Sequence, residues 1–160
     1  MLRLATAQDL PAINDIYNHF VLKSTCTYQT ESETIEARRA WFERHGPRHP
    51  ITVFEQDGQV VGWGSLSPFH PRAAYARTVE NSVYIHHTFH RRGIGRTMLA
   101  DLIDRAARLG HHTIIALISA DQAASVAMHE QLGFKKVAEL KEVGHKLGRW
   151  LDVIYMQKML

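Results

Sequence analysis

The chain has 160 residues, of which 45% are hydrophobic, and a formal net charge of +3. This length and apolar content predict one domain, residues 1–160, with a sizeable core. The basic residues form no long run, which makes nucleic-acid binding a weak alternative, and no apolar stretch is long enough to span a membrane. The single cysteine, Cys26, excludes an internal disulfide. Without a signal-peptide pattern near Met1, we expect a cytoplasmic protein.

The first part of the chain predicts a short strand and a helix. Residues 2–5 have the pattern of a strand, and Asp9 begins a helix with Pro11 in its first turn. Apolar residues recur on one face of this helix, which we expect to cover a sheet: Leu10, Ile13, Ile16, Tyr17 and Phe20.

A second helix is predicted after residue 30. Thr30 and Glu33 have the spacing of a capping box, and the helix is expected to reach Arg44. Its apolar side is expected to consist of Ala37, Ala40 and Trp41.

A β-hairpin and a loop follow. Asp57-Gly58 separates two β-rich runs, residues 50–55 and 59–66, and this dipeptide is a strong hairpin signal. The sheet is therefore expected to be partly antiparallel. Residues 68–76 contain two prolines and are predicted to form a loop.

The most informative stretch, residues 79–109, predicts a buried strand, a glycine turn and a helix. Gly93 and Gly95 let the backbone bend and approach a ligand, next to the free N–H groups of a helix start. Such a turn binds phosphate, and three arginines add positive charge that favours a diphosphate: Arg91, Arg92 and Arg96. The alternative is an ordinary solvated helix start.

Two common nucleotide-binding motifs are excluded at this turn. Met98 occupies the third glycine position of a Rossmann fingerprint, and no Gly-Lys-Ser/Thr sequence of a P-loop is present. Downstream, the pattern predicts a strand over residues 113–118, a helix over 122–132 and two final strands, 138–147 and 150–158, on either side of Gly148. The whole order is β-α-α-β-β-β-α-β-α-β-β, an α/β arrangement with a mixed central sheet flanked by helices.

The turn resembles a known family motif. Arg/Gln-x-x-Gly-x-Gly/Ala between a strand and a long helix is the acyl-CoA pyrophosphate motif of GNAT N-acetyltransferases, and residues 90–95, HRRGIG, resemble it with His90 in the first position. Three further segments resemble the phosphinothricin and methionine sulfoximine acetyltransferase branch: SVAMHEQLGF at 125–134, GRWLDV at 148–153 and TVENSVY at 78–84. The similarity covers nearly the whole chain and implies the GNAT acyl-CoA N-acyltransferase fold.

The resemblance implies acetyl-CoA as co-substrate and assigns residues to it. Backbone N–H groups of Val83, Tyr84 and Ile85 are expected to pair with the pantetheine amides and face the thioester oxygen. The pyrophosphate is expected at Arg91, Arg92, Gly93, Ile94, Gly95 and Arg96. Gln122 stands where the superfamily often has an asparagine that contacts coenzyme A.

Glu80 is the candidate general base. It lies near the start of the central strand, where an apolar run would bury its carboxylate and raise its pKa. A model α-amino group has a pKa of about 8, so modest help, through a water or directly, would deprotonate it near neutrality. The alternative is a structural ion pair with Arg77 or Arg72.

His129 is the candidate acid for the thiolate that leaves. It occupies the position where most GNAT enzymes have a tyrosine, and an imidazole with a pKa of about 6.5 could donate a proton. A histidine beside Met128 and Leu132 can equally be a packed or hydrogen-bonded residue.

The acceptor site is expected in the proline-containing loop and the region before the second helix. Arg72, Tyr75 and Arg77, with Phe69, suit an acceptor that has a carboxylate beside its amine. Arginine here can also simply neutralise Glu80. By resemblance the region around Tyr28 walls the acceptor pocket; Tyr28 and Trp41 are otherwise core aromatics.

Two metal-site readings fail on spacing. The segment HEQLG at 129–133 begins like a zincin helix, but Gly133 occupies the place of the second histidine. His86, His87 and His90 cluster without an acidic or thiol ligand at useful spacing, so we expect no metal.

The sequence therefore predicts a single-domain N-acetyltransferase that moves the acetyl group of acetyl-CoA to the α-amine of a small amino-acid analogue, by direct attack in a ternary complex. Phosphinothricin and methionine sulfoximine are the model acceptors. The alternatives are another small amine, a protein amine, or a non-catalytic regulator that binds coenzyme A. The resemblance also implies a homodimer.

Overall fold

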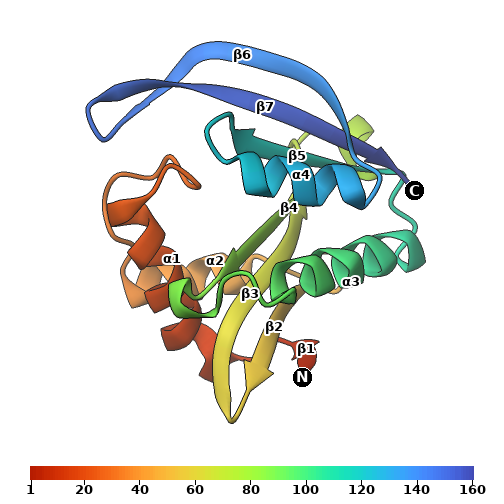
Figure 1. The fold of residues 1–160 in the computed structure, drawn as a ribbon. Helices are drawn as coiled ribbons and strands as arrows, with labels where there is room; N and C mark the ends of the chain where they lie inside the picture. Colours follow the sequence, from red (N-terminus) through yellow and green to blue (C-terminus); the bar gives the residue numbers. More distant parts are fainter.

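The computed structural model describes residues 1–160, which form one seven-stranded sheet with helices against both faces (Figure 1). The strands lie side by side in the order β1-β2-β3-β4-β5-β7-β6. Their bounds are β1 Leu2–Leu4, β2 Ile51–Gln56, β3 Gln59–Pro68, β4 Thr78–Ile85, β5 Thr113–Ser119, β6 Lys135–Lys146 and β7 Arg149–Met159. The predicted α/β class with a mixed central sheet is confirmed.

Four α-helices and three short 3-10 helices connect the strands: α1 Leu10–Lys23, α2 Ile35–Glu43, α3 Ile94–Arg108, α4 Ala123–Gln131, η1 Ala7–Asp9, η2 Ala73–Tyr75 and η3 His87–Phe89. The helices α1 and α2 lie on one side of the sheet, and α3 and α4 lie on the other (Figure 1). A buried cluster fills each side: Leu10, Ile13 and Phe20 pack with Trp63, and Leu99 and Leu102 pack with Val79 and Ile114. None of the helices combines the length and the apolar character that crossing a bilayer requires.

Two glycines in β3 let α3 pack close to the sheet. A Cβ on Gly62 would lie 3.1 Å from Met98 Sδ, and one on Gly64 would lie 3.1 Å from Leu102 Cδ1. Both α3 side chains are fully buried. Because any larger residue would push the helix outward, these glycines set the distance between α3 and the sheet.

The hairpin predicted at Asp57-Gly58 is confirmed. β2 and β3 pair in antiparallel register, and both turn residues have the positive φ that this tight connection needs, 52° at Asp57 and 77° at Gly58. β3 also pairs in antiparallel register with β4, and this pairing brings the central strand into the sheet.

The only parallel pairing in the sheet is short. β4 pairs with β5 from Thr78 to Glu80, opposite Thr113 to Ile115. Beyond this point β4 continues against β3 to Ile85, while β5 continues against β7 to Ser119. The two central strands therefore separate, and the opening between them positions the candidate site.

The predicted start of the second helix is wrong by four residues. The N-cap is Thr34, whose hydroxyl accepts a hydrogen bond from the Ala37 N–H at 3.1 Å, and not Thr30. The carboxylate of Glu33 makes an ion pair with Arg38 in place of a capping-box bond. An N-cap side chain accepts a hydrogen bond from a free backbone N–H two or three residues further on, and Thr34, not Thr30, makes this bond.

The predicted apolar side of this helix is also corrected. Ala37 and Ala40 are exposed, whereas Arg38 is only 2% exposed and Trp41 is half-buried. With the helix starting at Ile35, positions 35, 38 and 41 fall on one face and meet the sheet. A charged residue thus occupies the inner face.

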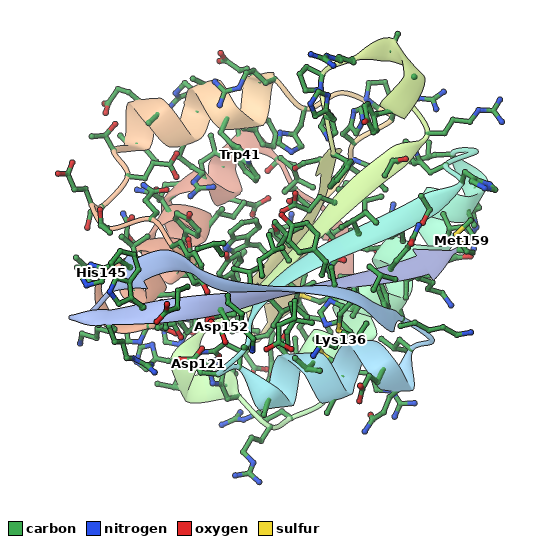
Figure 2. The ribbon with its side chains drawn as sticks, turned by 90° about the horizontal axis from the view of Figure 1, so that it is seen from above. Trp41, Asp121, Lys136, His145, Asp152 and Met159 are labelled. Atoms are coloured by element: carbon green, nitrogen blue, oxygen red, sulfur yellow. The ribbon has the colours of Figure 1, made fainter.

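The last two strands form the long hairpin expected around Gly148. Leu147 and Gly148 adopt positive φ values of 52° and 76° at its turn. Seen from above, the hairpin runs across the molecule, with His145 near the turn and Met159 at the other end (Figure 2). β6 is one of the two edge strands of the sheet, and β1 is the other.

Candidate active site

A cavity of about 460 Å³ lies where β4 and β5 separate. Residues 80–84 of β4 and 116–119 of β5 form its central walls. Side chains from α1, α2, β3 and the loop after α1 close one side, and residues of α4 close the other. Six residues predicted for the site line this cavity together: Tyr28, Glu80, Val83, Tyr84, Gln122 and His129.

Glu80 is half-buried on the cavity wall and has no charged partner. The alternation of β4 puts it on the same face as Tyr84, opposite Ser67 of β3. Burial alone raises the pKa of its carboxyl above the ordinary value. The alternative ion pair with Arg72 or Arg77 is absent from the structure. An unpaired carboxylate in a partly desolvated cavity has the properties of a general base.

His129 is buried, with 4% of its surface exposed, and both ring nitrogens have partners. Nδ1 lies 2.8 Å from the Ser125 carbonyl oxygen, so it carries the proton and donates. Nε2 lies 3.1 Å from Asn81 Nδ2 and accepts from that amide. Burial lowers the pKa of His129, which favours this neutral tautomer. Protonation of a thiolate by His129 therefore requires the imidazolium form, with Asn81 rotated.

Gln122 precedes α4 and its side chain is already engaged. Its Nε2 donates to Thr25 Oγ1 at 2.8 Å, and Thr25 Oγ1 donates in turn to the Asp121 carboxylate at 2.8 Å. Arg149 from β7 donates to the same carboxylate at 2.6 Å. This network attaches the loop after α1 to the end of β5, so Gln122 holds a wall of the cavity in place.

Tyr28 connects the same loop to the C-terminal strands. Its hydroxyl lies 2.9 Å from Ser119 Oγ and 3.1 Å from the Asp152 carbonyl oxygen. Its ring lies against Gly144 of β6, where an added Cβ would be only 2.5 Å from Cε2. Tyr28 thus lines the cavity and is also a packed aromatic residue.

The glycine turn lies at the far end of β4, next to α3. Gly93 has φ 78° and is the N-cap of α3, and Arg91 also has positive φ, 62°. The first intrahelical bond there is from Thr97 N–H to the Gly93 carbonyl, so the N–H groups of residues 94–96 have no helical partner. His90 Nε2 donates to the Ile85 carbonyl at 2.9 Å and fixes the turn to the end of the strand.

The charge at this turn is free to meet a ligand. Arg91, Arg92 and Arg96 are exposed, and Arg92 stacks its guanidinium 4.7 Å from the Phe89 ring centroid. Exposed arginines around unpaired N–H groups and a positive helix end are the features that favour an anion, and binding of the pyrophosphate here stays a prediction. Ile85 and the glycine turn do not line the cavity. Ile85 is the last residue of β4, and the turn follows it in the chain.

The four residues of the proline-containing loop do not line the cavity. Arg72, Tyr75 and Arg77 are exposed, and Phe69 packs on Tyr75 with ring centroids 6.0 Å apart. Their proposed contact with an acceptor stays a prediction.

The clustered histidines stack on one another. The His19 and His87 rings are parallel with centroids 3.9 Å apart, and His86 stacks on His87 at 4.4 Å. No group of three or more histidine, cysteine or acidic side chains is arranged to hold a metal ion.

A family model described as "Acetyltransferase (GNAT) domain" matches residues 2–155. The chain belongs to the GNAT acetyltransferase family. It is 39% identical to the L-methionine sulfoximine/L-methionine sulfone acetyltransferase of Salmonella typhimurium, and the match covers 99% of this chain and 94% of the relative. The resemblance seen in the glycine turn is confirmed, and the chain is an acetyl-CoA-dependent N-acetyltransferase.

Two solved structures have the same GNAT fold. A phosphinothricin acetyltransferase from Sinorhizobium meliloti in complex with acetyl-CoA has a TM-score of 0.97 and 35% identity, covering 100% of this chain and 88% of that one. A ribosomal-protein-alanine N-acetyltransferase from Brucella melitensis has a TM-score of 0.97 and 42% identity, covering 100% and 99%.

Sequence reasoning missed part of this GNAT cavity. Arg38, Trp63 and Asn81 line it, and none had been singled out. The spacing of Arg38 could have indicated its position, because it lies three residues from both Ile35 and Trp41 and therefore shares the inner face of the helix with them. The other two residues are buried by strand pairing, which a local pattern does not reveal.

Proposed function

We propose that this GNAT enzyme transfers the acetyl group of acetyl-CoA to the α-amine of a small amino-acid analogue such as methionine sulfoximine or phosphinothricin. The observation that carries the proposal is the cavity between the parted strands, with the unpaired carboxylate of Glu80 on its wall. The names of the Salmonella relative and the Sinorhizobium structure support this acceptor class. The residues 1–160 act as a single domain.

The chain supplies one group for each part of the transfer. The amine nitrogen attacks the thioester carbonyl, the C–N bond forms, the C–S bond breaks, and coenzyme A leaves as a thiolate. Glu80 takes the proton that the amine loses, directly or through a water. Backbone N–H groups of β4 between Val83 and Ile85 stabilise the charge that develops on the thioester oxygen. The leaving thiolate takes a proton from His129 as imidazolium or from water.

The glycine turn binds the other end of acetyl-CoA. Unpaired N–H groups at residues 94–96 and the three exposed arginines are suited to a pyrophosphate. Because β4 joins the cavity to this turn, an extended ligand can contact both.

A free-thiol assay with acetyl-CoA and a panel of amines tests the proposal. Methionine sulfone, methionine sulfoximine and phosphinothricin should release thiol with equimolar N-acetyl product. A peptide with N-terminal alanine, suggested by the Brucella structure, and simple alkylamines should react more slowly. Acetyl-CoA binding without thiol release from any amine would instead support a regulator, and a preference for the peptide would move the acceptor class to protein amines.

We also propose a homodimer in the cytoplasm. β6 is an edge strand, and the β6–β7 hairpin exposes Val137, Leu140, Val143, Leu147 and Trp150. Exposed apolar side chains on an edge hairpin are suited to a contact between subunits. Light scattering after size exclusion measures the state, and Trp150→Glu should shift it to the monomer. Cys26, which is half-buried in the cavity wall and forms no disulfide, suits a reducing compartment.

A further inference from the structure

The cavity contains one permanent positive charge. Among the residues that line it, Arg38 is the only arginine or lysine, and the carboxylates of Glu33 and Glu80 are the only acidic side chains. The loop arginines Arg72 and Arg77 are exposed elsewhere. An acceptor that brings a carboxylate into this cavity therefore meets one possible ion-pair partner on this chain.

The Arg38 guanidinium is held rigidly among aromatic rings. Its Cζ lies 4.6 Å from the ring centroids of both Tyr17 and Trp41 and 5.4 Å from that of Trp63. The side chain is 3% exposed. A guanidinium stacked in this way is less hydrated than one in solvent, so its hydrogen bonds to an anion are stronger.

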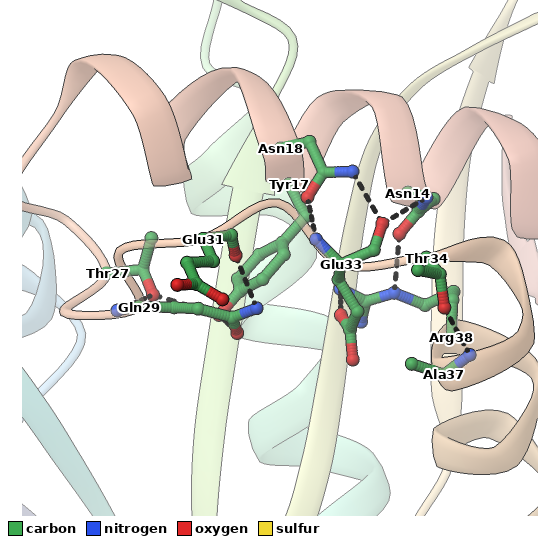
Figure 3. Close-up of polar contacts among 10 residues, drawn as sticks. All are labelled: Asn14, Tyr17, Asn18, Thr27, Gln29, Glu31, Glu33, Thr34, Ala37 and Arg38. Atoms are coloured by element: carbon green, nitrogen blue, oxygen red, sulfur yellow. Dashed lines mark hydrogen bonds and ion pairs between the residues drawn. The ribbon is translucent and has the colours of Figure 1, made fainter.

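A polar network fixes the position of this guanidinium (Figure 3). Nη2 makes an ion pair with Glu33, and Nε lies 3.4 Å from Asn14 Oδ1. The Glu33 backbone is itself held by α1: its carbonyl accepts from Asn14 at 3.0 Å and from Asn18 at 2.9 Å, and its N–H donates to Asn18 at 2.8 Å. Five hydrogen bonds and ion pairs thus orient the group before any ligand arrives.

One nitrogen of the fork is left over. Nη1 of Arg38 has no hydrogen-bond partner in the chain. Four side-chain atoms lack a partner and are also fully enclosed, and Nη1 is not one of them: Thr52 Oγ1, Trp63 Nε1, Asn81 Oδ1 and His111 Nδ1. It therefore keeps accessible surface in a side chain that lines the cavity. A buried, preoriented and incompletely used guanidinium is a carboxylate site.

We propose that Arg38 binds the α-carboxylate of the acceptor and makes this enzyme specific for amino acids over amines without a carboxylate. The inference rests on the proposed function, because it assigns one end of the amino-acid acceptor while Glu80 serves the amine end. Glu33 holds the guanidinium in place, and its charge partly offsets that of Arg38 at that end of the cavity.

The experiment compares, through kcat/KM, methionine sulfone and the analogue in which an uncharged carboxamide replaces its α-carboxylate. Arg38→Gln should lower the value for methionine sulfone on the order of 10- to 100-fold, mainly through KM, since a hydrogen bond to a charged group is lost. The carboxamide should change less than about 3-fold relative to wild type, because it makes no ion pair. The KM for acetyl-CoA should stay unchanged in both assays.

Two matched variants complete the test. Arg39→Gln removes an exposed charge from the same helix and should leave both acceptors unaffected. Arg72→Ala tests the rival guanidinium: loss of the carboxylate preference in this variant, with the preference retained in Arg38→Gln, would overturn the proposal. Equal losses for both acceptors in Arg38→Gln would also overturn it and leave Arg38 a structural residue.

A second measurement serves if Arg38→Gln does not fold. Glu33→Gln removes the ion pair that holds the Arg38 guanidinium in place, so it should raise the KM for methionine sulfone without changing that for the carboxamide. An unchanged KM for methionine sulfone, or an equal change for both acceptors, would contradict the proposal. Wild-type enzyme that releases no thiol with methionine sulfone overturns the proposed function itself, and this outcome is separate from a change in the ratio between two working acceptors.

Discussion

The amide nitrogen of Asn81 lies 3.1 Å from His129 Nε2, at the boundary between β4 and α4. The Ser125 carbonyl, 2.8 Å from Nδ1, can only accept, so the ring proton is on Nδ1 and Nε2 accepts from the amide. The other amide atom, Asn81 Oδ1, is buried without a partner. If the amide rotated by about 180°, Oδ1 would accept a hydrogen bond from a protonated Nε2. The pair can therefore accommodate both the neutral and the charged ring.

The folded protein should keep His129 neutral at lower pH than an ordinary histidine. Burial lowers its pKa from 6.5, so the unfolded chain binds the proton first. The stability that depends on the neutral ring is complete above about pH 6.5 and declines as pH falls below that value. ¹⁵N NMR of the imidazole should show the Nδ1–H tautomer, and denaturation between pH 5 and 8 should show less pH dependence in His129→Gln than in wild type. A ring pKa at or above 6.5 would contradict the assignment.

Glu80→Gln should lower turnover while leaving acetyl-CoA binding intact. General bases contribute on the order of 10² to 10⁴ in rate, and the loss should shrink at high pH, where free amine is abundant. It should also vanish at low pH, because burial raises the pKa of Glu80 above 4.5 and the wild-type carboxyl is then protonated. Pre-steady-state rates from pH 5 to 9 measure this profile.

The stability of the same variant provides the control. An acid with a raised folded pKa destabilises the fold as pH rises from its unfolded value of 4.5 through the folded one, and glutamine removes that penalty. Glu80→Gln should therefore have an unchanged or higher melting temperature at pH 7. A near-normal rate together with a lower melting temperature would identify Glu80 as a scaffold residue.

Gly93→Val should weaken acetyl-CoA binding more than it weakens the fold. Gly93 has φ 78° and Gly110, at the other end of α3, has φ 75°, and a Cβ at either position meets no atom within 4 Å. Valine therefore introduces the same backbone strain at both, roughly 1–3 kcal/mol. Calorimetric titration should show reduced affinity in Gly93→Val and wild-type affinity in Gly110→Val. Equal affinities in the two variants would refute the pyrophosphate site.

Gly144→Ala should displace Tyr28 and destabilise the cavity wall. The new Cβ would lie 2.5 Å from the Tyr28 ring, so the ring must move and its bonds to Ser119 and Asp152 are lost. Overpacking of this kind costs about 1–3 kcal/mol. Urea denaturation should show this loss in the wild-type background but little further loss when Tyr28→Ala is already present. Additive effects would show that the two residues do not act through their contact.

Much of this fold follows from local sequence, because its causes are local. The Asp57-Gly58 turn needs residues that tolerate positive φ, and the glycine turn needs Gly93 at φ 78°. Both turns can be recognised in the sequence from the residue types alone. Periodicity likewise identifies the strand that carries Glu80 and the helix that follows it. The sequence alone therefore determined the order of elements, the family and the place of the candidate base.

Tertiary structure decided which of these residues share a cavity. The separation of β4 from β5 after Glu80 depends on the pairing of β4 with β3, the strand before it, and of β5 with β7, which lies beyond α4 and β6 in the chain. The same long-range packing turns Arg38 inward onto Trp63, leaves Arg72 outside, and chooses the proton position of His129. Burial and partner geometry are properties of the assembled sheet, and they set charge and hydrogen bonding where local sequence cannot.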